Sequence, residues 1–542
     1  MKMTGAQAII EALKTENVNV VFGYPGAAIC PFYDVLRESG IRHILTRHEQ
    51  GAAHAASGYA RVTGKTGVCV ATSGPGATNL ITGIATAYMD SIPIVAITGQ
   101  VSTEQIGKDV FQEADITGAT APFCKHNYLV KNADELPRII REAFHIASTG
   151  RPGPVLIDVP IDVQEQEIWF EYPQNVEIRG YKPTYKGHSL QIKRIADAIA
   201  KAKAPIICAG GGVISGNAVD ELLCFAEKCC IPVTTTLMGK GAISSKHALY
   251  LGMVGSHGSK AANVAIHSTD LLLIMGARVG DRAIIGTDKI AENAQIVHID
   301  IDPAEIGKNI DVSIPVVGDI KDILAELASI VEKGDVKEWN DRLKQFKQGE
   351  TSFCQDIADC GYVNPKYLLA MLSEMIDRDT VITTEVGQNQ IWAANHCCLE
   401  SPRTFITSGG LGTMGYGLPA AVGVKIGRPE LKVIALSGDG SFQMSMQELG
   451  TIKQNRLGIK IILFNNLSLG MVREVQRSKY CGRYSQVDLS ENPDFIKLVE
   501  AYGFKGERIT ENSQVKKALE KMLSDDDTYL VECMVSPDEP TL

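Results

Sequence analysis

The sequence has no long hydrophobic run. Its longest apolar stretches, such as Leu271–Met275 and Ile461–Phe464, are far shorter than the roughly 20 residues that a helix needs to cross a bilayer. The first residues enter an amphipathic helical pattern directly, with neither the apolar core of a signal peptide nor an Arg- and Ser-rich transit segment. We therefore expect no membrane association and a cytoplasmic location.

The sequence also lacks a Cys-x-x-Cys motif and an excess of basic residues. None of its 13 cysteines belongs to a Cys-x-x-Cys pair, and reduced thiols in a cytoplasm fit this pattern best. Lys and Arg number 53 against 63 Asp and Glu, which gives a net charge of −10. Because this balance provides no basic stripe to neutralise phosphates, it argues against nucleic acid as the main partner.

What the sequence does contain is an α/β pattern. Its 542 residues exceed what one hydrophobic core usually supports, and short β-branched runs alternate with helical periodicity. This alternation predicts parallel sheets flanked by helices. The pattern is interrupted at residues 164–190 and 333–350, where we place domain joins. The three predicted domains are residues 1–165, 190–330 and 365–542.

The first and last of these domains share a faint internal repeat. Strand Val68–Ala71 runs into Ser73-Gly74-Pro75-Gly76, and strand Val433–Leu436 runs into Ser437-Gly438-Asp439-Gly440. A helical stretch and another strand follow in both. This succession is common in βαβ units, or it marks two similarly folded domains that enclose one ligand. The motifs described next favour the second interpretation.

The strongest motif is Gly438-Asp439-Gly440, followed after a gap of 24 residues by Asn465-Asn466, each after an apolar strand. The carboxyl ends of parallel strands are where open α/β sheets bind ligands. The glycines allow a phosphate to approach, and a helix starting near Ser441 directs free N–H groups at it. Asp439 and Asn466 offer hard oxygens suited to Mg²⁺. The alternative is two unrelated turns, each of a frequent kind.

A second candidate is Glu49, at the start of an Ala-rich helical stretch. An isolated Glu in this position is commonly an N-terminal helix acid favoured by the dipole. A zinc motif with His48 and His54 is excluded, because six residues separate the histidines and they do not share a helix face. In the middle domain, Gly210-Gly211-Gly212 after a strand indicates either a nucleotide site or a plain Rossmann-like scaffold.

The spacing of Asp439 and Asn466 resembles the signature of thiamine-diphosphate enzymes. The segments Gly23–Gly26, Glu49–Ala56 and Ser73–Asn79 look like the pyrimidine-binding domain of acetohydroxyacid synthases (acetolactate synthases). The resemblance to this family extends over essentially the whole chain. The resemblance implies that Glu49 bonds N1′ of the aminopyrimidine with a raised pKa, and that Mg²⁺ is bound by Asp439, Asn466 and the carbonyl of Ser468. It implies these cofactor-binding residues: Pro25, Gly26, Asn79, Gly387, Gln388, Asn389, Gly412, Met414, Gly438, Gly440, Ser441 and Met471.

The same resemblance implies two thiamine-diphosphate-binding domains flanking a Rossmann-like middle domain that binds structural FAD. Phe111 and Gln112 are implied to line the substrate pocket. Arg282 is implied to pair with the carboxylate of the second substrate, for which a fixed guanidinium fork is well suited. The implied FAD-binding residues are Arg151, Gly210, Gly211, His257, Arg278, Asp300 and Asp319.

The implied activity is that of an acetolactate synthase in branched-chain amino acid (isoleucine and valine) biosynthesis. Pyruvate is decarboxylated, and its two-carbon unit passes to a second 2-oxo acid, pyruvate or 2-oxobutyrate, giving 2-acetolactate or 2-aceto-2-hydroxybutyrate. A homodimer or homotetramer, with a possible small regulatory subunit, is implied as well. The alternatives are an FAD-dependent pyruvate oxidase and another thiamine-diphosphate decarboxylase or acetyltransferase.

The chain departs from the family pattern at several positions near the substrate. Val475 replaces a Trp that favours 2-oxobutyrate as acceptor, Ser256 replaces a Met, and Ile161 replaces a Lys. Val279-Gly280 replaces Phe-Asp, and Asn389 replaces a frequent His. Loss of the large aromatic wall forfeits ~1–3 kcal/mol of discrimination for one methylene. We therefore expect a weaker preference for 2-oxobutyrate than in Trp-bearing relatives.

Overall fold

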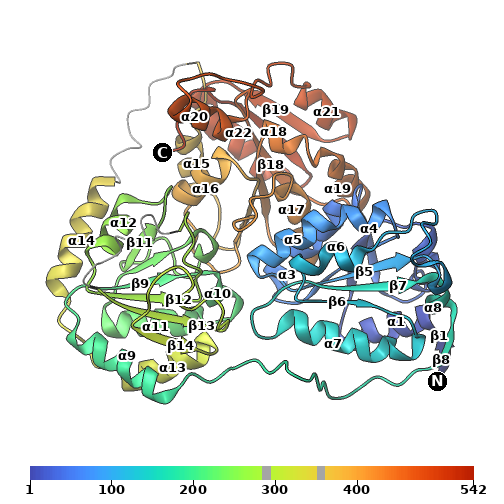
Figure 1. Ribbon diagram of the computed structural model, residues 1–542. Coiled ribbons are helices and arrows are strands. Elements are labelled where there is room, and N and C mark those ends of the chain that lie inside the picture. Colours follow the sequence, from blue (N-terminus) through green and yellow to red (C-terminus); the bar gives the residue numbers. More distant parts are fainter. Residues whose placement is uncertain (284–293, 351–360) are drawn as a thin grey trace.

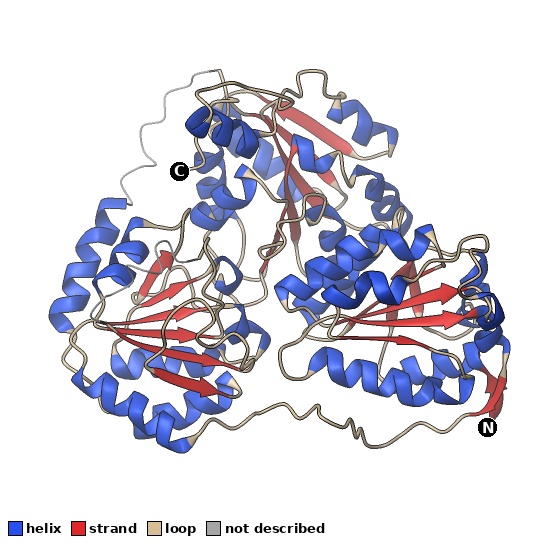
Figure 2. Cartoon of the chain, viewed as in Figure 1, coloured by secondary structure: helices blue, strands red, loops and turns tan. Residues whose placement is uncertain are grey.

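The computed structural model describes residues 1–283, 294–350 and 361–542. Three α/β units make up the molecule, and each contains a parallel sheet of six strands. Figure 1 shows the N-terminal unit (blue to cyan), the middle unit (green to yellow) and the C-terminal unit (orange to red) arranged around a common centre. Helices cover both faces of each sheet (Figure 2). The predicted three-domain α/β fold is confirmed.

The N-terminal sheet has the strand order β3-β2-β4-β5-β7-β6, with every pair parallel. Its strands are β2 (Val20–Gly23), β3 (Arg42–Leu45), β4 (Gly67–Ala71), β5 (Ile94–Gln100), β6 (His126–Leu129) and β7 (Val155–Pro160). Its helices are α1 (Gly5–Thr15), α2 (Cys30–Leu36), α3 (Glu49–Thr63), α4 (Pro75–Asn79), α5 (Ile81–Asp90), α6 (Ile116–Thr120), α7 (Leu136–Ser148) and α8 (Ile161–Glu165).

The C-terminal sheet has the order β16-β15-β17-β18-β20-β19, again parallel throughout. Its strands are β15 (Val381–Thr384), β16 (Phe405–Ile406), β17 (Val433–Gly438), β18 (Ile459–Asn465), β19 (Lys505–Ile509) and β20 (Tyr529–Met534). Its helices are α15 (Pro365–Met375), α16 (Gln388–His396), α17 (Gly417–Gly427), α18 (Asp439–Phe442), α19 (Leu449–Asn455), α20 (Gly470–Lys479), α21 (Phe495–Ala501) and α22 (Asn512–Ser524). Counted along the chain, both outer sheets follow the same order, with β4 equivalent to β17 and β5 to β18.

The middle sheet has the order β11-β10-β9-β12-β13-β14, which is the doubly wound Rossmann arrangement. Its strands are β9 (Pro205–Ala209), β10 (Val233–Thr235), β11 (Tyr250–Met253), β12 (Leu271–Met275), β13 (Gln295–Asp300) and β14 (Ile314–Val317). Its helices are α9 (Ser189–Lys201), α10 (Gly211–Ser215), α11 (Val219–Cys229), α12 (Lys260–Ser268), α13 (Ile320–Ile330) and α14 (Lys337–Glu350).

The charged stretch 333–350, in which we placed a domain join, contains helix α14 instead. Trp339 and Leu343, four residues apart, are buried against the middle unit, and the Trp339 indole N–H donates to the Pro205 carbonyl at 3.1 Å. The high charge of this stretch belongs to the solvent face of an amphipathic helix. The 164–190 segment differs as well, because β8 (Glu167–Trp169) pairs antiparallel with β1 (Lys2–Thr4).

The N-terminal and C-terminal units pack together through α3 and α17. A Cβ on Gly58 would lie 2.2 Å from the Ala420 carbonyl oxygen, and one on Gly423 would lie 1.8 Å from that of Ala55. The two helices can approach so closely only because these residues have no side chain. One hydrophobic core extends over both units, from Phe22 in β2 to Ile461 in β18. The relative position of the two units is therefore fixed by buried contacts.

No helix in the described ranges is both long and apolar enough to cross a membrane. The cysteines in these ranges are free, and several of them, such as Cys69, Cys208 and Cys533, are fully buried.

Candidate active site

A small cavity, about 90 Å³, opens at the carboxyl ends of β15, β17 and β18 in the C-terminal unit. Its walls come from the turn that starts α16, from the turn that starts α18, and from the loop after β18. Predicted residues that line this cavity are Gly387, Gln388, Asn389, Met414, Gly438, Asp439, Gly440, Ser441, Asn466, Ser468 and Met471. Gly412 lies next to it, facing Val386.

The three predicted metal ligands lie in this cavity as one carboxylate, one amide and one backbone segment. Asp439 is 2% exposed, and burial raises its pKa to about 6. The Asn492 amide donates to its Oδ2 at 2.8 Å, and among the described residues no lysine or arginine pairs with it. Asn466 accepts from the Ser468 N–H at 3.2 Å. A buried carboxylate without a cationic partner fits a bound divalent cation.

The backbone around the cavity has positive φ angles, which residues other than glycine rarely adopt. Gly387 has φ +141° at the start of α16, and Leu467 has φ +53° between Asn466 and Ser468. Left-handed backbone at a non-glycine residue is costly and concentrates at functional sites. The Asn389 amide oxygen is buried without a hydrogen-bond partner. An amide oxygen accepts and does not donate, so binding of a diphosphate would require the Asn389 amide to rotate and present its NH₂ group.

The N-terminal unit carries a second group of predicted residues at the equivalent edge of its own sheet. Glu49 begins α3, and the Asn79 amide donates to its Oε2 at 3.0 Å. Gly76 lies next to the Glu49 carboxylate, and Gly26 lies against Thr72 at the end of β4. Pro25 is exposed beside them. Glu49, Asn79 and the glycines thus form a half-site, which we call the pyrimidine half-site.

The two half-sites do not meet within one chain. No residue of the N-terminal unit lines the cavity in the described part of the C-terminal unit. Glu49 is only partly buried, so its own chain does not supply the seclusion from water that was predicted for it. Within the described residues, the two half-sites are therefore separate.

His54, which the spacing separates from a zinc motif, has a structural environment of its own. His54 is fully buried against Tyr416, with ring centroids 5.1 Å apart, and burial lowers its pKa to about 3. Within the described ranges, no group of three or more His, Cys, Asp and Glu side chains could hold a metal ion.

The other predicted catalytic residues lie outside both half-sites in the single chain. Phe111 is 87% exposed, and Gln112 has φ +59° next to Gly74. Arg282 is also exposed, and its Nε lies 3.8 Å from Asp281 Oδ2. Its carbonyl accepts from the Ser256 N–H at 3.0 Å. The side chains of Phe111 and Arg282 are exposed to solvent, and that of Gln112 is half-buried.

The residues predicted to bind FAD divide into two groups. Gly210, Gly211, Arg278, Asp300 and Asp319 all lie at or just beyond the carboxyl ends of the middle strands. Burial raises the pKa of Asp300 to about 6. A Cβ on Gly210 would lie 2.2 Å from the Gly276 carbonyl, so this position requires glycine.

Two members of the set have other surroundings. Arg151 reaches across from the N-terminal unit and forms ion pairs with Asp302 at 3.2 Å and Glu305 at 2.7 Å. His257 lies on the side of the C-terminal unit, where its carbonyl accepts from the Asn395 amide at 2.8 Å.

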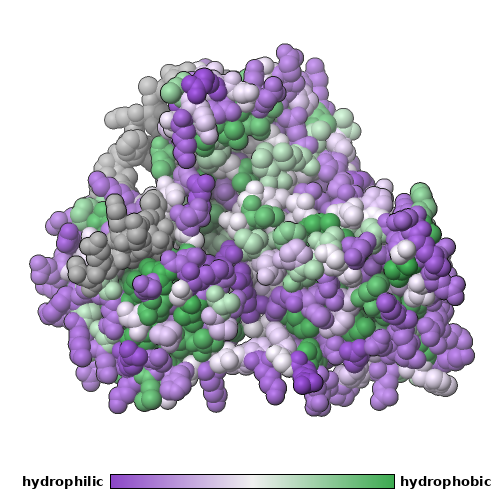
Figure 3. Space-filling view, viewed as in Figure 1, coloured by the Kyte–Doolittle hydropathy of each residue, from purple (hydrophilic) through white to green (hydrophobic). Residues whose placement is uncertain are grey.

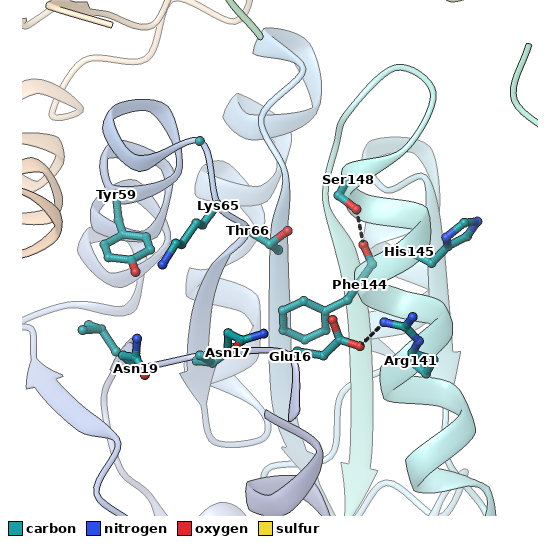
Figure 4. Close-up of a pocket in the computed structure, with 13 residues that line it drawn as sticks. Glu16, Asn17, Asn19, Tyr59, Lys65, Thr66, Arg141, Phe144, His145 and Ser148 are labelled. Carbon is teal, nitrogen blue, oxygen red and sulfur yellow. Dashed lines mark hydrogen bonds and ion pairs between the residues drawn. The ribbon is translucent and has the colours of Figure 1, made fainter. Parts of the chain in front are cut away.

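A larger cavity, about 550 Å³, lies between the α1–β2 turn, the α3–β4 turn and α7, at the opposite edge of the N-terminal sheet (Figure 4). No predicted site residue lines it. Its charges have structural explanations, since Arg141 pairs with Glu16 at 2.6 Å. Lys65 lies just after the end of α3, where the helix dipole favours a cation. Size alone therefore does not make this cavity the functional site.

Models of the three domains of thiamine pyrophosphate enzymes match the chain in succession. The N-terminal TPP binding domain matches residues 3–119, the central domain residues 192–327, and the C-terminal TPP binding domain residues 385–533. A probable acetolactate synthase large subunit from Methanocaldococcus jannaschii is 49% identical over 99% of this chain and 93% of its own length. The chain belongs to the acetolactate synthase large-subunit family.

Other members of the acetolactate synthase family are similar over comparable lengths. The isozyme 2 large subunit of Escherichia coli is 47% identical over 99% of this chain and 96% of its own. The large subunit of Corynebacterium glutamicum is 47% identical over 96% and 84%. Three predictions are confirmed: membership of this family, a thiamine-diphosphate-dependent transferase activity, and a role in branched-chain amino acid biosynthesis. The pyruvate oxidase alternative is not favoured.

Sequence reasoning missed three residues that support the half-sites of this acetolactate synthase family member. The buried Glu385 carboxylate accepts from the N–H groups of Gly415 and Gly417, at 2.7 and 2.8 Å, which fixes the turn after Met414. Asn492 holds Asp439, as described above, and Glu448 holds the segment before Glu49. Glu385 was within reach of prediction, since it follows a strand directly. Asn492 and Glu448 act over long sequence separations that no local pattern reveals.

Proposed function

We propose that two copies of this chain assemble so that the pyrimidine half-site of each faces the C-terminal cavity of the other, and that acetolactate is made at the two composite sites. The argument rests on the placement of Glu49 and Asp439. They lie at equivalent edges of equivalent sheets, and their two half-sites do not meet within one chain. Exposed apolar side chains near both half-sites fit a partner surface. They are Phe111, Leu411, Met444, Leu467, Val472 and Val475. On the face drawn in Figure 3, hydrophobic residues gather over the C-terminal unit and its border with the N-terminal unit.

In this proposal the chain's own residues bind the metal and the cofactor, orient them, and exchange a proton with the aminopyrimidine. Asp439, Asn466 and Ser468 hold Mg²⁺, and Asn389 with the α18 N-terminus holds the diphosphate. Met414 would contact the bound cofactor from the cavity wall. Glu49, oriented by Asn79, shares a proton with N1′ of the aminopyrimidine. Thiamine diphosphate, when bound, supplies the electron sink for decarboxylation and carbon–carbon bond formation.

Substrate recognition is assigned to residues that the single chain leaves exposed. Arg282 orients the carboxylate of the second 2-oxo acid, while Phe111 and Gln112 close the pocket over the cofactor. FAD would occupy the carboxyl edge of the middle sheet, with Gly210 allowing close approach and Arg278 facing its phosphates. For this, Arg151 would have to exchange Asp302 and Glu305 for the cofactor. A small regulatory subunit is a further possible partner of this family member.

The proposed function is tested by product analysis. The purified chain, supplied with thiamine diphosphate, Mg²⁺ and FAD, is given pyruvate with and without 2-oxobutyrate. We expect 2-acetolactate from pyruvate alone and 2-aceto-2-hydroxybutyrate in addition when both acids are present. Acetaldehyde or acetate as the sole product, or oxygen uptake that matches pyruvate consumption, would refute the proposal.

Acceptor preference is expected to depend on Val475. This residue lies on α20, one turn from Val472 in the cavity wall, and is 40% exposed. Val475→Trp adds an aromatic wall that contacts the extra methyl group of 2-oxobutyrate, so it should raise the preference for 2-oxobutyrate over pyruvate at least about 10-fold. The measurement is the product ratio in competition. Lys479→Trp, one turn further along the helix, is the control and should leave the ratio unchanged.

A further inference from the structure

Two buried carboxylates cross the boundary between the thiamine domains within one chain. Each comes from one domain and holds a loop of the other, and the loop that it holds carries a residue of the other domain's half-site. They are Asp90, at the end of α5 in the N-terminal unit, and Glu448, at the start of α19 in the C-terminal unit.

Asp90 holds the loop that leads to Met414. Its Oδ1 accepts from the Gly410 N–H at 2.7 Å, and its Oδ2 lies 2.5 Å from Arg61 Nη2. The Asp90 side chain is fully buried and that of Arg61 is 9% exposed. Four residues earlier on α5, the Thr86 hydroxyl lies 2.7 Å from that of Thr413. The loop is thus fixed to the neighbouring domain at two points on either side of Gly412.

Glu448 holds the segment that leads to Glu49. Its Oε1 accepts from the Arg47 backbone N–H at 2.9 Å, and its Oε2 lies 2.6 Å from the Thr451 hydroxyl. The Arg47 guanidinium donates in turn to the Gly450 carbonyl at 3.2 Å. Glu448 is fully buried, and a Cβ on Gly51 would lie 2.6 Å from its Oε1. No side chain other than hydrogen fits at the first turn of α3 beside it.

We propose that Asp90 and Glu448 are reciprocal positioning residues, Asp90 placing the Met414 loop for cofactor binding and Glu448 placing Glu49 for turnover. The inference rests on the proposed function and extends it to residues that touch neither cofactor nor substrate. Because Met414 supports the bound cofactor, a displaced loop weakens binding. Because Glu49 acts on a proton, a displaced α3 N-terminus slows turnover while the diphosphate anchor is unaffected.

The chemistry of each contact predicts which substitutions are tolerated. In Asp90→Asn a single amide oxygen can accept from either the Gly410 N–H or Arg61, and the NH₂ group then faces a donor at the other position, so the paired contact that fixes the loop is broken. In Glu448→Gln the amide oxygen still accepts from Arg47 N–H, and the amide nitrogen can donate to the Thr451 hydroxyl. Glu448→Ala leaves the buried Arg47 N–H unpaired. Asparagine at position 90 should therefore not maintain the positioning contact, whereas glutamine at position 448 should maintain it.

The experiment measures the dissociation constant of thiamine diphosphate and kcat at saturating cofactor for each purified full-length variant. Asp90→Asn should raise the dissociation constant about 10-fold or more, with kcat within about 3-fold of wild type. Glu448→Ala should lower kcat about 10- to 100-fold with the dissociation constant within about 3-fold. Glu448→Gln should restore most of kcat. If Glu448→Ala does not fold, Thr451→Val should produce a smaller loss of the same kind.

Arg403→Met is the matched control for loss of packing. Arg403 joins the same three units through the Arg61 carbonyl at 2.8 Å and Asn217 at 2.8 Å, but holds neither loop. It should lower the melting temperature without altering either constant. Equal effects of Asp90→Asn and Glu448→Ala on both constants, or a matching loss in Arg403→Met, would overturn the proposal. A wild-type chain that binds no thiamine diphosphate would overturn the proposed function and this inference together.

Discussion

Glu49→Gln is expected to bind thiamine diphosphate with near-normal affinity and to lose about 10²- to 10⁴-fold in kcat. Glutamine occupies the same volume and keeps an oxygen that can accept from the Asn79 amide, which donates to Glu49 at 3.0 Å. It cannot exchange a proton with the aminopyrimidine, however. The loss should therefore fall on turnover, while the diphosphate and metal contacts in the other domain are unaffected.

The measurements for this variant are isothermal titration calorimetry with thiamine diphosphate in Mg²⁺ buffer and steady-state production of acetolactate. Asn79→Ala is the companion variant, since it removes the orienting amide and keeps the acid, so a smaller loss in kcat is expected. Near-normal turnover by Glu49→Gln would remove Glu49 from the catalytic role. Loss of binding in this variant would instead assign it to cofactor anchoring.

Mixing two inactive variants should restore activity if the sites are shared between chains. Asp439→Asn removes the carboxylate for Mg²⁺, and Glu49→Gln removes the acid, so each homodimer has two damaged sites. In a mixed dimer, one site combines both defects, and the other combines Glu49 of one chain with Asp439 of the other, both intact. Random mixing makes about half of the dimers mixed, each with one good site, so about a quarter of wild-type activity is expected.

This complementation separates the shared site from a site within one chain. If each chain completed its own site, every site in the mixture would carry one defect, and no activity would return. The two variants are unfolded or dissociated together and reassembled, with each variant treated alone as the control. Light scattering should give the mass of a dimer or a larger assembly. A fully active monomer would refute shared sites.

Much of the fold was predictable because buried strands of parallel sheets are short, β-branched and regularly spaced. The apolar stretch Leu271–Met275 coincides with strand β12, and the predicted turn at Gly438–Gly440 begins where β17 ends. The 333–350 stretch was misjudged, because its charge concealed the buried face formed by Trp339 and Leu343. Local composition does not reveal which face of a charged helix is covered.

The site was predictable to a lesser degree, and for a physical reason. Asp439 and Asn466 follow strands, so parallel-sheet geometry alone brings them to one edge. The Asn492 contact depends on a loop that returns to Asp439 within the C-terminal unit, and the Glu448 contact depends on how two units pack, so neither is visible in local sequence. Arg282 and Phe111 remain exposed in one chain, and their predicted roles depend on groups that only an assembled, loaded enzyme contains.

The equivalent strand order of the outer sheets has a consequence for assembly size. In the proposed assembly each chain offers one surface of each kind, so a pair related by a two-fold axis would satisfy both surfaces at once and leave no unmatched end. Two different surfaces on one molecule that bind each other could also associate head to tail into open-ended fibres. Closure of the pair disfavours this growth. In the proposed assembly, two sheets of the same type within one polypeptide would thus limit its size by symmetry.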